Sequence, residues 1–236
     1  QAKLTAAGHE LMREGERLLA DMDAIANRVK RVATGWESQF TIAVDGIIDR
    51  TTVMELCEAF MALNAPTRLK LRDETLTGTL EALTSGQADL ALGIAGSFSE
   101  SGTTSGIHSH ALGPMRFVFA MAPHHPLAHA PEPLTDALIG QHRAVAVADS
   151  VQRGAGVTIG LLPGQDVFTV SNMHSKIEAQ VRGLGVGFVP ELMVQPLIDQ
   201  GVLVVREVDR PQRVAQLSYA WRIPDGSEGE RGGRAL

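Results

Sequence analysis

QFTIAV at residues 39–44 and DLALGI at residues 89–94 are short apolar runs of the kind that form fully buried strands. Between them lie a helical pattern over about 51–63, a strand pattern over 68–72 and a second helical pattern over about 77–85. The order is therefore strand, helix, strand, helix, strand. Such an order predicts an α/β fold in which crossover helices join the strands of a parallel sheet.

The second half of the chain repeats this alternation of strands and helices. Four prolines between Pro123 and Pro133 indicate a rigid connector that precedes it. We expect strands over 117–121, 144–148, 168–170, 186–189, 202–205 and 216–221, a short helix over 136–139 and a longer one over about 174–182. The chain is therefore predicted to be α/β, with two small doubly wound lobes joined by crossing strands, as in periplasmic binding proteins.

The predicted fold divides the chain into five segments. Lobe I is expected over residues 39–118 and lobe II over 119–213. A return strand to lobe I follows over 214–223. The Gly- and charge-rich segment 224–236 is expected to be a flexible tail, and residues 1–35 a linker and dimerisation helix.

The N-terminal segment carries a heptad pattern. Apolar or small residues recur at alternating intervals of four and three, at Leu11, Gly15, Leu18, Met22, Ile25, Val29 and Val32. A narrow seam with this spacing is typical of a long association helix whose partner helix covers it. The alternative is an ordinary amphipathic helix that lies on the body of its own chain.

Composition limits the classes of function. The chain has 236 residues, a net charge of −6 and 4% aromatic residues, so by itself it is a poor candidate for binding nucleic acid. It contains no apolar run long enough to span a membrane, and its polar start is unlike a signal peptide. Cys57 is the single cysteine, which suits a reducing compartment, so a cytoplasmic location is expected.

Four short segments carry a resemblance to one family. They are Leu4-Thr5-Ala6-Ala7-Gly8, then LTSGQADLA at 83–91, APHHPLA at 122–128 and GLGVGFVP at 183–190. In this order and spacing they resemble the linker helix and effector-binding domain of LysR-type transcriptional regulators, over about residues 4–222. Two departures are Asp73-Glu74-Thr75, where many members have Glu-Gly, and Ala88, where the family has Leu.

The resemblance implies a function for the chain. It implies the ligand-sensing and oligomerisation region of a DNA-binding transcriptional regulator, in which a small metabolite binds between two lobes. The partners expected from it are a small polar or anionic effector and further copies of the chain, as a homodimer or homotetramer. The chain starts where the family's DNA-binding domain ends, so that domain is expected to be missing and DNA to be contacted only through it.

The effector site is expected where strands end. Ligands of such sheets bind at the carboxyl ends of the strands, and two lobes place the crevice between them. Helix starts there offer N–H groups and hydroxyls to a small anion, although each hydroxyl has the alternative role of a helix cap. The predicted effector-binding residues are Asp45, Gly46, Ile47, Thr75, Thr77, Gly93, Ile94, Ala95, Ser150, Ser171, Met173, His174, Phe188 and Pro190.

Two other classes of function fit the sequence less well. A periplasmic-type solute-binding protein would share the two-lobe plan, but the absence of a signal peptide and the heptad helix argue against it. An enzyme would need a catalytic set, and the sequence contains no nucleophile elbow and no phosphate-binding loop. The prolines around His124 also disfavour a helical pair of metal ligands, so we expect neither a metal nor a cofactor.

Overall fold

The computed structural model describes residues 5–96, 106–152 and 156–222. The predicted tail over 224–236 therefore lies outside the described residues. Within the described ranges, none of the helices combines the length and the apolar character that a membrane-spanning segment needs.

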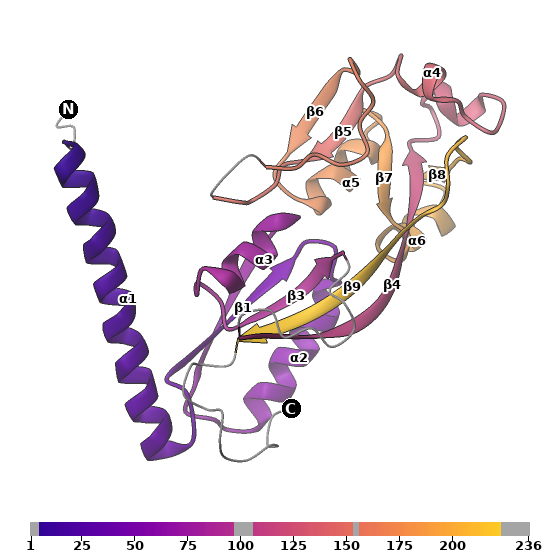
Figure 1. The fold of residues 1–236 in the computed structure, drawn as a ribbon. Helices are drawn as coiled ribbons and strands as arrows, with labels where there is room; N and C mark the ends of the chain where they lie inside the picture. The colour runs from indigo at the N-terminus through magenta and orange to yellow at the C-terminus, as the bar shows by residue number, and fades with distance from the viewer. Residues whose placement is uncertain (1–4, 97–105, 153–155, 223–236) are drawn as a thin grey trace. The chain divides into compact units, whose positions relative to one another are not determined.

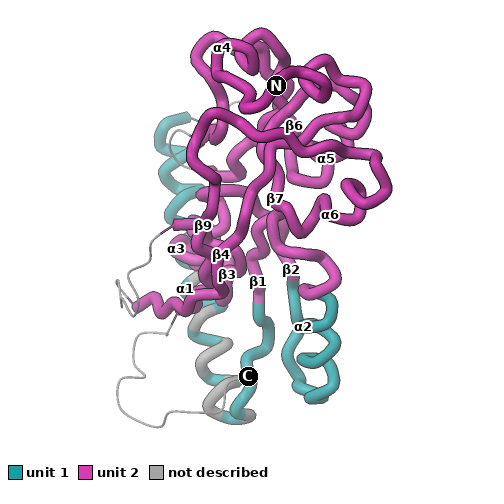
Figure 2. Tube along the Cα trace, turned by 90° about the vertical axis from the view of Figure 1, so that its right-hand side faces the viewer, with its two compact units in different colours: residues 1–40, 54–70 teal, residues 41–53, 71–236 magenta. Residues whose placement is uncertain are grey.

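The chain divides into two compact units, and the first comprises residues 1–40 and 54–70 (Figure 2). Its longest element is α1 (Ala6–Thr34), a helix of 29 residues. Five residues of the predicted seam expose 52% to 76% of their surface, namely Leu11, Leu18, Met22, Ile25 and Val29. Elsewhere in this unit the Thr67 hydroxyl donates to the Glu37 carbonyl at 2.6 Å, and the Arg68 N–H donates to the Ser38 carbonyl at 3.0 Å.

The second unit comprises residues 41–53 and 71–236, and it holds most of the main sheet (Figure 2). The strand order is β2-β1-β3-β9-β4-β7, and β8 pairs with β4. The bounds are β1 (Gln39–Asp45), β2 (Arg68–Glu74), β3 (Leu90–Ala95), β4 (Ile107–Met121), β7 (Gly187–Pro190), β8 (Val204–Val205) and β9 (Arg213–Arg222). As predicted, β1 and β3 are parallel.

A smaller parallel sheet pairs β5 (Ala144–Val147) with β6 (Val167–Val170). The α/β class predicted from the sequence is therefore confirmed. Besides α1, the described residues form α2 (Arg50–Ala62), α3 (Thr77–Thr84), the 3-10 helix η1 (Pro126–His129), α4 (Asp136–Ile139), α5 (Met173–Val181) and α6 (Glu191–Asp199).

Two long strands run through both halves of the second unit. β4 was expected only over 117–121, and β9 only over 216–221. Both are longer, and they pair antiparallel from Ile107↔Arg222 to Phe117↔Arg213 (Figure 1). We call residues 41–53, 71–118 and 214–222 of this unit lobe I, and residues 119–213 lobe II. β4 and β9 are thus the crossing strands that join the lobes.

Buried apolar residues of the described chain form three clusters. One lies in lobe I and includes Ala43, Leu83 and Ile94. A second lies in lobe II and includes Phe119, Leu127 and Val186. A third contains Ile47 of lobe I together with Met173, Ile177 and other residues of lobe II, so the two lobes share part of their core.

Candidate functional site

The start of α3 in lobe I is held by a carboxylate from lobe II. The residue before the helix, Leu76, has a φ of 53° and offers no side-chain cap. Instead, Asp149, which follows β5, accepts hydrogen bonds from the Thr77 N–H at 3.1 Å and the Gly78 N–H at 3.2 Å. The Thr77 hydroxyl donates to the same carboxylate at 2.6 Å. The free N–H groups of this helix start, which suit an anion, are therefore already occupied.

Asp149 also organises its own loop. Its carboxylate accepts from the Val151 N–H at 3.1 Å and from the Val157 N–H at 2.9 Å. Burial raises the pKa of Asp149, but the hydrogen bonds from Thr77, Val157, Val151 and Gly78 outweigh burial and lower it. The carboxylate is therefore charged at neutral pH.

Ser150 makes a second set of contacts between the lobes. Its hydroxyl donates to the buried carboxylate of Glu74 at 2.5 Å and accepts from the Thr75 N–H at 2.9 Å. The Thr75 hydroxyl in turn donates to the Ala148 carbonyl at 2.6 Å. The other oxygen of Glu74 accepts from Arg72 at 2.6 Å. Every one of these polar groups therefore has a partner within the protein.

The approach of the lobes at this point requires a glycine. A Cβ placed on Gly78 would lie 2.0 Å from the Ser150 hydroxyl oxygen and 2.9 Å from the Ser150 carbonyl carbon. No side chain fits in that space, because nonbonded carbon and oxygen atoms do not approach so closely. The contact therefore requires Gly78, a residue that the sequence analysis did not identify.

Asp45 lies beneath α3, at the exit of β1. It is 5% exposed, and it accepts from the Ile47 N–H at 3.0 Å and the Thr79 hydroxyl at 3.1 Å. Burial raises the pKa of Asp45 from 3.8 to about 6, and the nearby charge of Asp149 adds to this rise. The hydrogen bonds from Ile47 and Thr79 act in the opposite direction but do not cancel it.

Some of the other predicted residues meet across the lobes. A Cβ on Gly46 would lie 3.8 Å from the Cβ of Met173, so the exit of β1 faces the start of α5. Ile47 and Met173 are both buried and belong to the shared apolar cluster. The structure therefore brings these three predicted residues together.

The remaining predicted residues lie in three kinds of place. Gly93 and Ile94 are buried in lobe I, and Ala95 pairs with Leu217 of β9. Ser171 and His174 are exposed at the start of α5, where the helix cap is Asn172, whose side chain accepts from the Ser175 N–H at 2.8 Å. Pro190 ends β7 opposite Phe117, and Phe188 of the same strand packs against Phe119.

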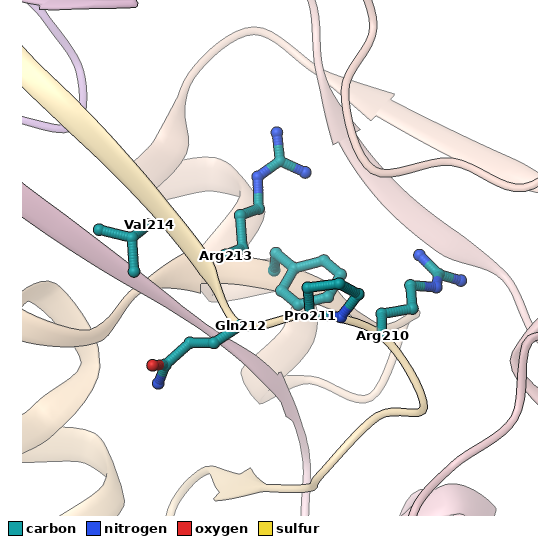
Figure 3. A pocket seen from close by; sticks show the side chains of 6 residues that line it. Arg210, Pro211, Gln212, Arg213 and Val214 are labelled. Carbon is teal, nitrogen blue, oxygen red and sulfur yellow. The ribbon is translucent and has the colours of Figure 1, made fainter.

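Phe188 also lines a pocket of about 400 Å³ in lobe II (Figure 3). The rest of the lining comes from one segment at the start of β9: Arg210, Pro211, Gln212, Arg213 and Val214. Sequence reasoning missed the two arginines because they follow no strand exit. The signal was present in the basic spacing Arg206, Arg210, Arg213 around Pro211, but the sequence does not show that these residues face Phe188.

The described residues contain no group of three or more His, Cys, Asp or Glu side chains arranged to hold a metal ion. Of the eight histidines, His125 has a lowered pKa, caused first by burial and then by the charges of His142 and His124. Its Nδ1 accepts from the Leu127 N–H at 3.2 Å, which is a structural role at the start of η1.

Comparisons with known proteins agree with this architecture. Residues 33–225 match the sequence model of the LysR substrate binding domain. The chain is 36% identical over 208 residues to the uncharacterized HTH-type transcriptional regulator YeeY of Escherichia coli K12, covering 88% of this chain and 66% of that protein. The chain thus spans slightly less than two thirds of the length of that relative.

Two solved structures share the fold. The regulatory domain of MetR, a LysR family regulator from Neisseria meningitidis, is 20% identical with a TM-score of 0.60, over 80% of this chain and 87% of that one. Full-length LysG from Corynebacterium glutamicum, described with bound effector Arg, is 21% identical with a TM-score of 0.59, over 94% of this chain and 74% of that one. The match over residues 33–225 covers most of the chain, and this protein therefore belongs to the LysR substrate binding domain family.

Proposed function

We propose that this chain is the effector-sensing region of a LysR-type transcriptional regulator, and that its effector binds where lobes I and II meet. The observation that carries the proposal is the contact between Asp149 and the start of α3. In addition to their shared core and two crossing strands, the lobes hold each other here through these hydrogen bonds. A ligand that offers its own oxygens to Thr77 and Gly78 can replace Asp149.

Replacement of Asp149 links binding to the arrangement of the lobes. A ligand shifts an equilibrium only by the difference between its affinities for the two arrangements. An effector with a carboxylate fits the α3 start only when Asp149 has left it, so it favours the arrangement in which this contact is open. The proposed regulator is not an enzyme, acts in the cytoplasm, and contacts DNA through a part other than lobes I and II.

The effector site is tested with a metabolite library, by thermal shift and then calorimetry on this chain. With a confirmed ligand, Thr77→Ala is expected to weaken binding about tenfold, since a hydrogen bond to a charged group is worth roughly 1.5–3 kcal/mol. Asp149→Ala is expected to strengthen binding, because the internal competitor is gone. Thr84→Val, at the exposed end of the same helix, serves as the control. If none of these substitutions alters the affinity of the confirmed ligand, the proposed position of the effector site is contradicted.

Self-association is assigned to α1. The seam of Leu11, Leu18, Met22, Ile25 and Val29 is more than half exposed in the single chain, as a helix face that meets a second copy would be. Burial of one leucine contributes about 1.5–3 kcal/mol. The double variant Leu18→Asp with Ile25→Asp should therefore reduce the mass measured by light scattering, while Glu16→Gln on the same helix leaves it unchanged. An unchanged mass in the double variant argues against a helix-mediated dimer.

A further inference from the structure

Lys176 is a buried cation without a counter-ion. It lies on α5 with 6% of its surface exposed, and among the described residues no carboxylate is paired with it. Its ammonium group lies 3.3 Å from the point where a Cβ of Gly187 would stand, so glycine leaves room for it at the start of β7. Burial, followed by the charge of Arg213, lowers the pKa of Lys176 to about 8. The group therefore still carries its charge at neutral pH.

Arg213 is a second cation without a carboxylate partner among the described residues. Its guanidinium carbon lies 5.7 Å from the centre of the Phe117 ring and 5.8 Å from that of Phe188. One of its nitrogens lies 3.3 Å from where a Cβ of Gly160 would stand. The aromatic rings thus hold the guanidinium in place without neutralising it.

Arg210 adds a third positive charge to the same place. It forms an ion pair with Asp136, yet its Nη2 is buried and has no hydrogen-bond partner among the described residues. Figure 3 shows Arg210 and Arg213 extending from one segment on the side opposite Gln212.

The charges in this region do not balance. Among the described residues, Lys176, Arg210 and Arg213 together have one carboxylate partner, Asp136, which pairs with Arg210. Burial lowers the pKa of both Lys176 and Arg213. An unpaired buried charge is costly, so proteins leave one only where something else neutralises it. Hydrogen-bond donors that have no partner inside the protein indicate the direction from which a missing acceptor approaches.

We propose that lobe II contains an oxyanion-binding site, in which Arg210 and Arg213 contact the anion and Lys176 supplies positive charge behind them. The inference rests on the proposed sensing function: it adds a subsite in lobe II to the proposed contact at α3, and it names the chemical class of the group that binds there. The pocket is also lined by Phe188, Pro211 and Val214, which favour a carbon skeleton over a bare inorganic ion. The ligand is therefore a small organic acid that carries a carboxylate or a phosphate group.

The decisive experiment uses calorimetry and thermal unfolding of this chain with succinate, with glycerol 3-phosphate and with inorganic phosphate, each against chloride at matched ionic strength. Succinate or glycerol 3-phosphate is expected to bind saturably and to raise the melting temperature. The arm that binds more tightly identifies the group as carboxylate or phosphate. Tighter binding of inorganic phosphate than of either organic acid, or no saturable binding in any arm, overturns the proposal.

Variants locate the site. Arg213→Gln and Lys176→Met are each expected to weaken binding at least tenfold, whereas Arg143→Gln removes one positive charge from an exposed ion pair of lobe II and should leave binding unchanged. Lys176→Met should also raise the melting temperature without ligand, because it removes an unpaired charge. If that variant does not fold, Arg213→Gln decides alone. Equal weakening by Arg143→Gln, or none by Arg213→Gln, overturns the site.

The two proposals fail in different ways. A ligand from the metabolite library whose affinity depends on Thr77 but not on Arg213 would overturn the oxyanion site and leave the sensing function standing. A ligand that depends on Arg213 but not on Thr77 would support the oxyanion site and overturn the replacement of Asp149.

Discussion

The start of α3 and the arginine pocket of lobe II are both polar regions of the second unit, but they differ in how completely their charges are paired. At α3, Asp149 accepts five hydrogen bonds, and both oxygens of Glu74 have donors. In the pocket, Arg213 has no carboxylate partner among the described residues, and Arg210 keeps an unpaired nitrogen. A ligand at the fully paired region must replace an internal partner, whereas a ligand at the incompletely paired region adds a partner that the protein lacks.

Gly78→Val tests the paired region most severely. The added Cβ would lie 2.0 Å from the Ser150 hydroxyl oxygen, so the lobes must separate and lose the contacts of Asp149 and Ser150 together. We expect a loss of about 3 kcal/mol or more in the free energy of unfolding, measured with urea. Thr84→Val introduces the same side chain at an exposed position of α3 and should cost less than about 1 kcal/mol. Equal losses in the two variants would show that the close approach is unimportant.

Asp45→Asn tests whether burial beneath α3 has an energetic cost. Because the pKa of Asp45 is raised in the folded chain, the favourable contribution of its neutral form is complete below pH 3.8 and is lost as the pH rises through about 6. Each pKa unit is worth about 1.4 kcal/mol, so wild-type protein should lose about 3 kcal/mol relative to Asp45→Asn over that interval. Urea unfolding at several pH values measures this. If the unfolding free energies of the two proteins change with pH in parallel, the energetic cost assigned to the buried Asp45 carboxylate is contradicted.

Asp149→Ala measures how much the fully paired carboxylate of Asp149 contributes to stability. Its loss leaves the N–H groups of Thr77 and Gly78 without their acceptor, which we expect to cost about 2 kcal/mol of unfolding free energy. The matched control is Asp166→Ala, whose exposed carboxylate meets Arg143 and should be worth less than about 1 kcal/mol. A cost for Asp149→Ala no greater than that of the control would contradict the role given to this contact.

The smallest expected difference separates two neighbours at the start of α5. Asn172→Ala should cost about 1 kcal/mol, because the Asn172 side chain caps the helix by accepting from the Ser175 N–H. Ser171→Ala should change the unfolding free energy by less than about 0.5 kcal/mol, because Ser171 is exposed and its hydroxyl accepts a hydrogen bond from the exposed Asn172 side-chain amide at 3.2 Å, not from the helix backbone. Thermal unfolding of the pair measures both. A reversed order would mean that Ser171 is the true cap.

The sequence predicted the elements whose signals are local. The buried strands near residues 39–44 and 89–94, the short helix over 136–139 and the helix before GLGVGFVP all appear within one or two residues of their expected bounds. Apolar runs and glycine or proline ends suffice for such segments. In contrast, α6 was missed because Pro190 and Pro196 make its segment look like a loop.

The longer-range features were beyond local signals. The extension of β4 back to Ile107 depends on its pairing with β9, about a hundred residues later, and its own sequence contains Gly113 and Pro114. The pairing of Asp149 with Thr77 joins residues from different lobes. Among the described residues, no carboxylate is paired with Lys176 or Arg213. This property depends on how the whole chain folds and cannot be read from the neighbouring sequence. The predicted site residues stay a proposal, although several of them lie at this contact.

The paired crossing strands have a mechanical consequence. Since β4 and β9 belong to both lobes and are hydrogen-bonded along their shared length, one lobe cannot turn relative to the other without twisting this ribbon. The pairing register shifts between Ala111 and Gly113, where Ser218 and Leu217 of β9 are also paired with Ile94 and Ala95 of β3. A turn of one lobe would therefore strain the hydrogen bonds between β4 and β9. Under the proposed sensing function, this strain would favour the return of the lobes to the arrangement described above once a ligand departs.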